Sequence, residues 1–445
     1  MEIIVQTYLG NAWHDAATIS FEQPTAGYVS PASVSYGVDY FSEQASRDYD
    51  PDYPIRDLRA LSIRNPVDLD TRRTSRWPAF LFDLLPQGNA RERLSKSLKL
   101  DPNQRETDLP LLLRAAGSPV GNLRIKEAAQ QEEIRLQGIR RCGLTLQDIL
   151  KRTDQFLEVV DDHALLASGS SGLQGEWPKI ALTMATDGLY YPDPMVGDNE
   201  AMEHVIVKLQ RQGSEYGVIL ETEAVYSRVG QEIGLNVYLP STAGNGSLLI
   251  PRFDRSVDED GHTWRYGQES MMSAVGVADF GQNDTHERYV QLLKDFSDDP
   301  QTDILEYLKR DAANLALGNH DNHGRNTAIS KYSDGSIRLS PLFDFAPMKL
   351  ARDTIVRSTK WACMRDGGSD YNPDWAKICE VVAGDDLDPQ VLASGLVEFA
   401  DRLEHAPRLA VELGANPEAI EMATNRCSDI VSGLRELKSS LDHSR

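Results

Sequence analysis

The sequence is organised around the segment Leu317-Gly318-Asn319-His320-Asp321-Asn322-His323-Gly324-Arg325-Asn326, which concentrates histidine, carboxylate and amide side chains. Before it, apolar residues recur at helical spacing between positions 304 and 315, and Gly318 supplies the left-handed conformation that ends many helices. After it, two β-like stretches within residues 327–339 flank an Asp-Gly pair, which is a strong signal for a hairpin turn. The segment is therefore predicted to be a polar loop between a helix and a β-hairpin.

The predicted hairpin returns the chain to Asp344, so that Asp321, Asn326 and Asp344 are expected to meet one ligand. Phosphoryl transfer from ATP uses such a set: one carboxylate receives the proton of the attacking hydroxyl, and an amide oxygen and a second carboxylate hold Mg²⁺. Protein kinases place an Asp, four intervening residues and an Asn in a loop, followed after a short hairpin by Asp-Phe-Gly. Here the spacing matches, and Ala346 replaces the glycine. The alternative is a helix end whose polar side chains only bond local backbone.

Upstream features follow the order found in kinases. A Gly/Ser-rich stretch before Lys179 predicts a loop whose backbone N–H groups can approach phosphates. A β-rich strand then ends near Lys208, a helix carries Glu223 as a partner for that lysine, and a buried-looking strand at 248–255 takes the place of the adenine-binding hinge. Each feature alone has an ordinary explanation, such as a turn or a solvated lysine, and their order supports the kinase interpretation.

The remaining chain predicts a β-containing start and several helices. Strands are expected at 3–9 and 17–21, joined through Gly10-Asn11. Helices are expected at 77–86, 89–100, 109–116, 144–157 and 391–441, the last broken at Gly414. The predicted domains are an N-terminal subdomain at 1–150, a kinase-like small lobe at 151–262 and a helical catalytic lobe at 263–445.

Composition limits the class of protein. A length of 445 residues is enough for about two to three domains of the usual size. The hydrophobic content of 40% is typical of a protein with folded cores. With 46 Lys and Arg against 68 Asp and Glu, the net charge of −22 disfavours unaided binding to nucleic acid. The arginine-rich stretch 56–76 is interpreted as a salt-bridged, solvated face, with a partner or DNA surface as the alternative.

Cysteine spacing and the absence of an evident targeting segment bear on the location of the protein. The four cysteines are far apart, which predicts neither a zinc site nor a disulfide framework. No signal peptide and no membrane-spanning run is evident, so a cytoplasmic location is expected.

On its motifs the sequence resembles the HipA family of serine/threonine kinase toxins. The residues that carry the resemblance are Leu84-Leu85-Pro86, Gly172-Leu173-Gln174, the strand ending in Lys208, Arg252-Phe253-Asp254-Arg255, the loop from Asp321 to Asn326, and Phe343-Asp344.

The resemblance implies an α+β, protein-kinase-like two-lobed fold with an N-terminal α/β subdomain and a mostly helical C-terminal lobe. It makes Asp321 the catalytic base, and Asn326 and Asp344 the Mg²⁺ ligands. The residues that it assigns to ATP are Ser170, Ser171, Gly172, Gln174, Lys179, Lys208, Glu223, Pro251, Arg252, Phe253, His323 and Phe343.

The activity implied by the resemblance is ATP- and Mg²⁺-dependent phosphorylation of a protein serine, on an aminoacyl-tRNA synthetase or another translation component, together with autophosphorylation. The implied partner is a HipB-like DNA-binding antitoxin. Gly169 holds the position at which the family commonly has its autophosphorylated serine, and Ser168, Ser170 and Ser171 are nearby substitutes. At the hinge, Pro251 removes one backbone donor for adenine.

Three other functions remain open at the level of sequence. A small-molecule kinase would share the Asp-to-Asn loop. A metal-dependent hydrolase would use His320, Asp321 and His323 around a transition metal. A non-catalytic or weakly active kinase-like corepressor scaffold, bound to the antitoxin, would bind ATP without transferring phosphate.

Overall fold

The computed structural model describes residues 1–166, 177–211, 213–353, 355–364 and 370–443. The chain forms two compact units that do not follow chain order. The first contains Met1–Leu209, Leu249–Gln282 and Ile329–Ile337, and the second contains Gln210–Leu248, Asn283–Ala328 and Arg338–Arg445. Domain boundaries near residues 150 and 262 remain a prediction.

The first unit begins with an antiparallel sheet in the order β4-β3-β2-β1-β5. Gly10 and Asn11 turn the chain between the first two strands with φ angles of 54° and 65°, so the predicted opening hairpin is confirmed. The other strands are short and were not predicted. The strands are β1 (Glu2–Leu9), β2 (Ala12–Phe21), β3 (Ala32–Tyr36), β4 (Arg72–Thr74) and β5 (Leu123–Ile125).

Helices pack around this sheet, and two helix predictions need correction. The expected helix at 77–86 is reduced to α2 (Leu81–Leu84). Its end follows from Pro86, which favours the extended backbone that Leu85 adopts, with a φ of −89° and a ψ of 128°. The expected helix at 144–157 is two helices, because Arg152 is left-handed with a φ of 53°. The helices of this unit are α1 (Val38–Gln44), α2, α3 (Gly88–Ser97), α4 (Asp108–Ala115), α5 (Lys126–Leu136), α6 (Leu146–Lys151), α7 (Asp154–Leu166) and α9 (Met271–Ala274).

A second sheet of the first unit has the order β7-β6-β8-β10. Its strands are β6 (Lys179–Ala185), β7 (Tyr190–Pro192), β8 (Ala201–Leu209) and β10 (Ser247–Pro251). Ile180, Leu182, Val205 and Val207 form its core together with Phe156 of α7. The predicted strand with Lys208 near its end is therefore confirmed.

The predicted strand at 248–255 is interrupted. The chain leaves β10 at Pro251 and forms a new strand, β11 (Arg255–Val257), which pairs with β12 (Thr263–Arg265). The predicted hairpin after the polar loop is confirmed as β14 (Ala328–Lys331) and β15 (Ile337–Leu339), in a sheet with β13 (Gly267–Ser270).

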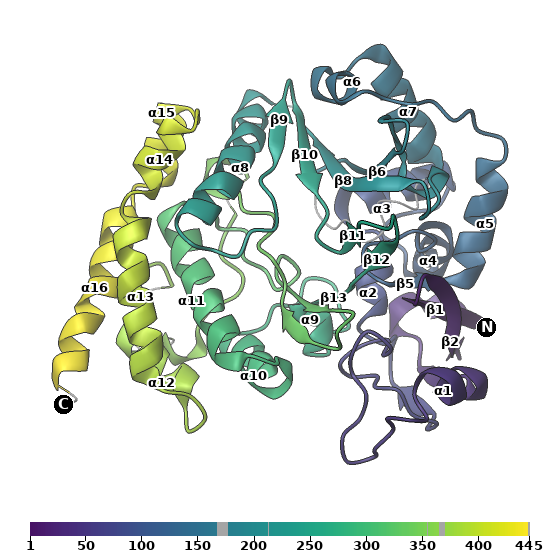
Figure 1. Ribbon diagram of the computed structural model, residues 1–445, viewed down its shortest axis with the longest axis horizontal. Coiled ribbons are helices and arrows are strands. Elements are labelled where there is room, and N and C mark those ends of the chain that lie inside the picture. Colours follow the sequence, from purple (N-terminus) through teal and green to yellow (C-terminus); the bar gives the residue numbers. More distant parts are fainter. Residues whose placement is uncertain (167–176, 212, 354, 365–369, 444–445) are drawn as a thin grey trace. The chain divides into compact units, whose positions relative to one another are not determined.

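The second unit is mostly helical. In Figure 1, α11, α13 and α16 run side by side, in agreement with their contacts. The predicted C-terminal helix is four helices, because the chain breaks before Pro407 and at residues 424–426 as well as at the predicted Gly414. The elements are α8 (Ser214–Glu232), β9 (Thr242–Gly244), α10 (His286–Phe296), α11 (Pro300–Ala316), α12 (Trp375–Ala383), α13 (Pro389–Leu403), α14 (Ala406–Glu412), α15 (Pro417–Ala423) and α16 (Cys427–His443).

A buried ionic cluster, here called the Asp193 cluster, includes residues from the point where the predicted strand is interrupted. Its members are Asp193, His204, Arg252, Asp254 and Arg255. Asp193 accepts two hydrogen bonds from Nη1 of Arg255, at 2.7 and 2.9 Å. Asp254 accepts from Nε and Nη2 of Arg252, at 2.9 and 2.6 Å. Burial opposes ionisation of Asp193 and Asp254, but the neighbouring arginines hold the pKa of Asp193 well below its usual value and lower that of Asp254 to about 2. Burial lowers the pKa of His204 to about 4.

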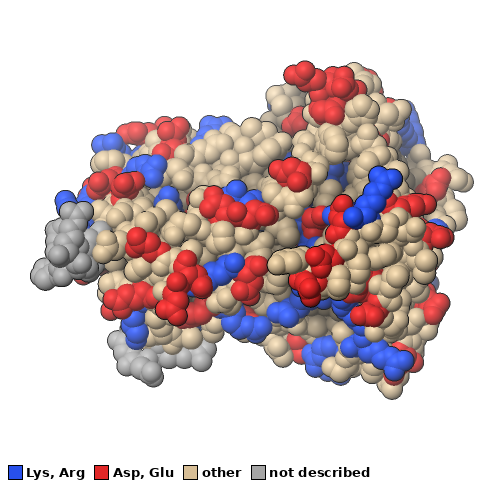
Figure 2. Space-filling view, turned by 60° about the horizontal axis from the view of Figure 1, so that its bottom comes forward, with Lys and Arg blue, Asp and Glu red and all other residues tan. Residues whose placement is uncertain are grey.

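Surface charges are of both signs and interspersed over the face shown in Figure 2. In the arginine-rich stretch, Arg59 pairs with Asp57 at 2.7 Å and Arg72 pairs with Asp68. Arg76 pairs with Asp279 at 2.9 Å. These pairs support the salt-bridged interpretation of residues 56–76. Within the part of the chain that the structure describes, no helix is long and apolar enough to cross a membrane.

Candidate active site

The polar loop begins where the sequence predicted, at the end of α11. Gly318 has a φ of +73°, and a Cβ at this position would lie 2.6 Å from the carbonyl oxygen of Ala423. The hydroxyl of Tyr226 donates to the carbonyl of Leu317 at 2.9 Å, and the N–H of Lys349 donates to the carbonyl of Gly318 at 2.9 Å. The start of the loop is therefore fixed by three separate segments of the second unit.

We expect Gly318→Ala to lower the free energy of unfolding by about 2–5 kcal/mol, because it combines a strained left-handed conformation with a backbone clash. Gly335→Ala is the control, since Gly335 has a φ of +88° and nothing within 4 Å of its added Cβ. That variant carries the conformational strain alone, at about 1–2 kcal/mol. Urea denaturation measures both, and equal losses would show that the contact with Ala423 relaxes without cost.

Within the loop, side chains bond to backbone across the predicted Asp-to-Asn spacing. Nδ2 of Asn326 donates to the carbonyl of Asp321 at 2.9 Å, and the N–H of Asn326 donates to the carbonyl of His323 at 2.9 Å. The alternative of local backbone bonding therefore accounts for the nitrogen of Asn326. It leaves the amide oxygen, which is the atom a metal would take.

The carboxylate of Asp321 stays accessible, with 34% of the side chain exposed. Its Oδ1 lies 3.3 Å from Nε2 of His323, while the N–H of Asp321 donates to Oδ1 of Asn319 at 3.3 Å. The other ring nitrogen of His323 is buried and has no hydrogen-bond partner among the described residues. The carboxylate is thus oriented by its neighbours but still open to an incoming group.

The hairpin returns the chain to this loop as predicted. The N–H of Ser340 donates to the carbonyl of Ala328 at 2.9 Å, and Nδ2 of Asn319 donates to the carbonyl of Asp344 at 3.4 Å. Asp344 has a φ of 50°, a conformation that asparagine and aspartate tolerate best after glycine. One cavity of about 30 Å³ is bordered by Asp321, Asn326, Phe343 and Asp344, among others. The structure therefore brings together the predicted base and both predicted metal ligands.

Behind the loop lies a group of buried residues that sequence reasoning missed, here called the His286 cluster: His286, Tyr307, Asp311, Arg357 and Trp361. Asp311 accepts from Nη2 of Arg357 at 2.5 Å and from Nε1 of Trp361 at 3.0 Å. Nδ1 of His286 lies 2.7 Å from the hydroxyl of Tyr307, and burial lowers the pKa of His286 to about 4. The sequence feature that could have revealed this cluster is a carboxylate, Asp311, among the apolar positions of a helix.

This cluster holds the segment that supports the loop. Arg357 and Trp361 bracket Thr359, whose carbonyl accepts from Nδ2 of Asn322 at 3.0 Å. The N–H of Ser358 donates to Oδ1 of the same Asn322 at 3.1 Å. Both ends of one amide group therefore fix the polar loop to residues 358–359.

The residues predicted to contact ATP are divided between the units. In the first unit, Lys208 is 3% exposed and its ammonium group lies 5.0 Å from the ring centre of Trp177, rather than pointing into water. Lys179 of β6 lies opposite Lys208 of β8 in the antiparallel pairing of these two strands. In the second unit, Glu223 is buried on α8. Because Lys208 and Glu223 belong to different units, their predicted pairing remains a prediction.

The predicted hinge begins at Pro251, the last residue of β10, and continues through the two residues that follow this strand, Arg252 and Phe253. The guanidinium group of Arg252 is buried in the Asp193 cluster, and its backbone N–H donates to the carbonyl of His204 at 2.9 Å. Neither group of Arg252 is therefore available to a nucleotide in this conformation. The predicted positions Ser168, Ser170, Ser171, Gly172 and Gln174 lie outside the described residues.

The two histidines of the loop do not form a transition-metal site. The ring of His320 packs edge-on against Tyr371, 5.2 Å between centres, and burial lowers its pKa. Among the residues that the structure describes, no group of three or more His, Cys, Asp and Glu side chains has the arrangement of a metal site. The observed geometry gives the hydrolase alternative no support.

Comparisons with known proteins bear on the fold and the family. The architecture is a kinase-like α+β fold. The model of the HipA-like C-terminal domain matches residues 171–407, and that of the HipA N-terminal domain matches residues 38–126. The chain belongs to the HipA family, as its motifs predicted.

The relatives include both a protein sequence and solved structures. The putative kinase Y4mE of Sinorhizobium fredii is 30% identical over 280 residues, which is 60% of this chain and 63% of that protein, so the match spans less than two thirds of the relative. HipA of Shewanella oneidensis, solved with HipB and its operator DNA, has a TM-score of 0.62 at 15% identity, over 99% of this chain and 98% of that one. The Helicobacter pylori kinase CtkA matches 54% of this chain and 88% of its own, with 15% identity and a TM-score of 0.39.

Proposed function

We propose that this chain is an ATP- and Mg²⁺-dependent protein serine/threonine kinase of the HipA type. The observation that carries the proposal is the single cavity bordered by Asp321, Asn326 and Asp344. Asp321 accepts the proton of the attacking serine hydroxyl, and His323 orients its carboxylate. General-base catalysis of this kind needs an accessible carboxylate close to the acceptor, which the exposed side chain of Asp321 provides.

The donor set fits Mg²⁺. Because Nδ2 of Asn326 is engaged by the carbonyl of Asp321, the amide presents its oxygen, and Asp344 adds a carboxylate. Mg²⁺ prefers such oxygen ligands and usually keeps several waters. When bound, the ion would neutralise charge on the transferred phosphoryl group. The nucleotide contacts of Lys179, Lys208 and Glu223 remain predictions.

The direct test is transfer of labelled γ-phosphate from ATP, with Mg²⁺ or with EDTA, to the purified chain and to proteins of a cell extract. We expect Mg²⁺-dependent label on serine, with self-labelling at Ser168, Ser170 or Ser171 and at least one labelled protein of the translation apparatus. ATP binding without any transfer would refute the kinase proposal and favour the scaffold. Label on small molecules alone would favour the small-molecule kinase.

We expect Asp344→Asn to raise the Mg²⁺ concentration needed for half-maximal transfer by at least about tenfold, because one anionic ligand is lost. Asparagine also adopts the left-handed conformation of Asp344, so the fold is expected to persist. A titration of transfer rate against Mg²⁺ measures the effect. An unchanged titration curve would show that Asp344 is not a metal ligand.

We extend the proposal to a HipB-like DNA-binding antitoxin as partner, since the Shewanella structure with this fold contains HipB and operator DNA. The net charge of −22 makes direct DNA binding by the chain alone unfavourable. In a gel-shift assay, we expect the chain to retard operator DNA only when the antitoxin is present. Retardation by the chain alone would contradict this division of roles.

A further inference from the structure

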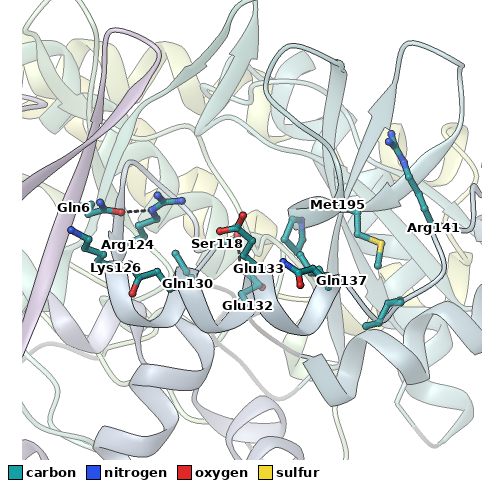
Figure 3. Close-up of a pocket in the computed structure, with 15 residues that line it drawn as sticks. Gln6, Ser118, Arg124, Lys126, Gln130, Glu132, Glu133, Gln137, Arg141 and Met195 are labelled. Carbon is teal, nitrogen blue, oxygen red and sulfur yellow. Dashed lines mark hydrogen bonds between the residues drawn. The ribbon is translucent and has the colours of Figure 1, made fainter.

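A second and much larger pocket, of about 580 Å³, lies entirely within the first unit, along one face of α5. Figure 3 shows Gln6 and Arg124 hydrogen-bonded to each other at one end of this pocket, with Arg141 at the other. The opposite wall is the short 3-10 helix η3 (Asp193–Met195). This volume is in the range of pockets that bind small organic molecules. None of the residues assigned to the proposed kinase reaction lines it.

The wall of the pocket contains a buried carboxyl group with one unused oxygen. Glu132 of α5 is 4% exposed, and its Oε2 accepts from the hydroxyl of Ser118 at 2.7 Å. Its Oε1 is buried and has no hydrogen-bond partner among the described residues. Buried acceptors are nearly always satisfied in folded proteins, so an unused one at the wall of a pocket points to a donor supplied by a ligand.

The local backbone makes room for this carboxyl group. A Cβ at Gly117 would lie 2.7 Å from Oε2 of Glu132 and 3.1 Å from the carbonyl oxygen of Ala128. Only glycine allows the chain before Ser118 to approach α5 so closely. The position of Glu132 is thus built into the packing of two segments and does not depend on a mobile surface side chain.

The charges at both ends of the pocket are already matched. Lys126 pairs with Asp15, and Arg141 pairs with Glu200 at 2.8 Å. The guanidinium group of Arg124 lies over the ring of Trp13, 4.1 Å from the centre of that ring. A further cation or anion is therefore not needed to balance these ends.

The pKa of Glu132 reflects its burial and the charged groups around it. Burial raises the pKa of Glu132 to about 7, while Ser118, Arg135 and Arg114 lower it and Asp193 raises it. The two arginines oppose this rise in pKa from the protein side without cancelling it. What Oε1 lacks is a hydrogen-bond donor, and the rest of the wall is largely apolar, with contributions from Ala129, Leu136, Pro194 and Met195.

We propose that this pocket binds a small, neutral and largely apolar molecule that carries an N–H donor, such as a carboxamide or an amino-heterocycle. The N–H group donates to Oε1 of Glu132, and the apolar part packs between α5 and η3. This site is independent of the proposed kinase activity.

Three probes of nearly the same shape test the proposal: benzamide, benzoate and benzylammonium, added to the full-length protein at pH 8. Ligand-observed NMR measures their binding. We expect benzamide to bind at least about tenfold more tightly than benzoate, which has no N–H donor, and more tightly than benzylammonium. Equal binding of benzoate, tighter binding of benzylammonium, or no benzamide binding at about 10 mM would overturn the proposal.

Variants locate the binding. Glu132→Met removes the acceptor and is expected to weaken benzamide binding at least about tenfold, which is a difference of about 1.4 kcal/mol. Should that variant fail to fold, Ala129→Phe fills the pocket from the solvent side of α5 and is expected to abolish binding. Gln131→Met, at an exposed position of the same helix that does not line the pocket, is the matched control and should retain benzamide. Benzamide bound equally by Ala129→Phe and the wild type would refute the site.

Discussion

Asp321→Asn is expected to lower the rate of γ-phosphate transfer by a factor of about 10²–10⁴, because general-base catalysis typically contributes that much. Asparagine has nearly the shape of aspartate, and the bonds that shape the loop use the backbone of residue 321 rather than its carboxylate. The substitution therefore removes proton acceptance and little else. Its transfer rate should be measured at saturating ATP and Mg²⁺.

The matched control is Asp334→Asn, at the turn of the same hairpin. Asp334 is exposed and bonds only to Ser336, through interactions that asparagine also makes. We expect it to transfer phosphate at the wild-type rate. A wild-type rate in Asp321→Asn as well would remove Asp321 from the chemistry while leaving the kinase proposal intact.

Asp193→Asn is expected to lower the free energy of unfolding by about 3–5 kcal/mol, because removing one partner of a buried ion pair leaves charge uncompensated. Asp193 is the shared acceptor of its cluster, receiving hydrogen bonds from Arg255 and from the hydroxyl of Thr183 at 2.6 Å. Its loss leaves two arginines buried with one remaining carboxylate. Urea denaturation at pH 7 measures the change.

The surface pair Arg141–Glu200 provides the control, since its side chains are both 44% exposed. We expect Glu200→Gln to cost no more than about 1 kcal/mol, as is typical of exposed pairs. Similar losses in both variants would mean that burial adds nothing to the Asp193 cluster.

The same cluster predicts a dependence on pH. Because its arginines hold the pKa of Asp193 well below the usual value and that of Asp254 at about 2, both carboxylates remain ionised in the folded state where they would take up protons if unfolded. Their stabilisation is therefore fully present above about pH 4 and is lost as the pH falls through the folded pKa values. The difference in the free energy of unfolding between wild type and Asp193→Asn should shrink as the pH falls below about pH 4. A difference that grew on acidification would contradict the assignment.

The candidate site was largely predictable because it depends on short-range geometry. Gly318 ends a helix, an Asp-Gly turn closes a hairpin, and these two local features suffice to bring Asp344 back to Asp321. The same reasoning failed at 77–86, where the apolar pattern extends beyond the short helix Leu81–Leu84. It also missed α5, whose sequence has few apolar residues and little periodicity.

Other parts could not be predicted because they depend on contacts between distant residues. The hydrogen bonds of Asp193 to Arg255 join residues 62 positions apart. Motif reasoning placed Arg252 at the nucleotide, whereas its side chain is buried in the Asp193 cluster. Similarly, the partners of Asp311 are Arg357 and Trp361, which lie 46 and 50 positions away in the sequence.

The discontinuous path of the chain has a consequence for the synthesis of the protein. The first unit includes Ile329–Ile337, so its last segment leaves the ribosome only after about three quarters of the chain has been made. A nascent chain that stops at residue 262 lacks both that segment and part of the stretch from 249 to 282. Neither unit is then complete, and the loop from 317 to 326 does not yet exist. Interrupted translation therefore yields fragments in which neither unit, and no complete candidate site, is present.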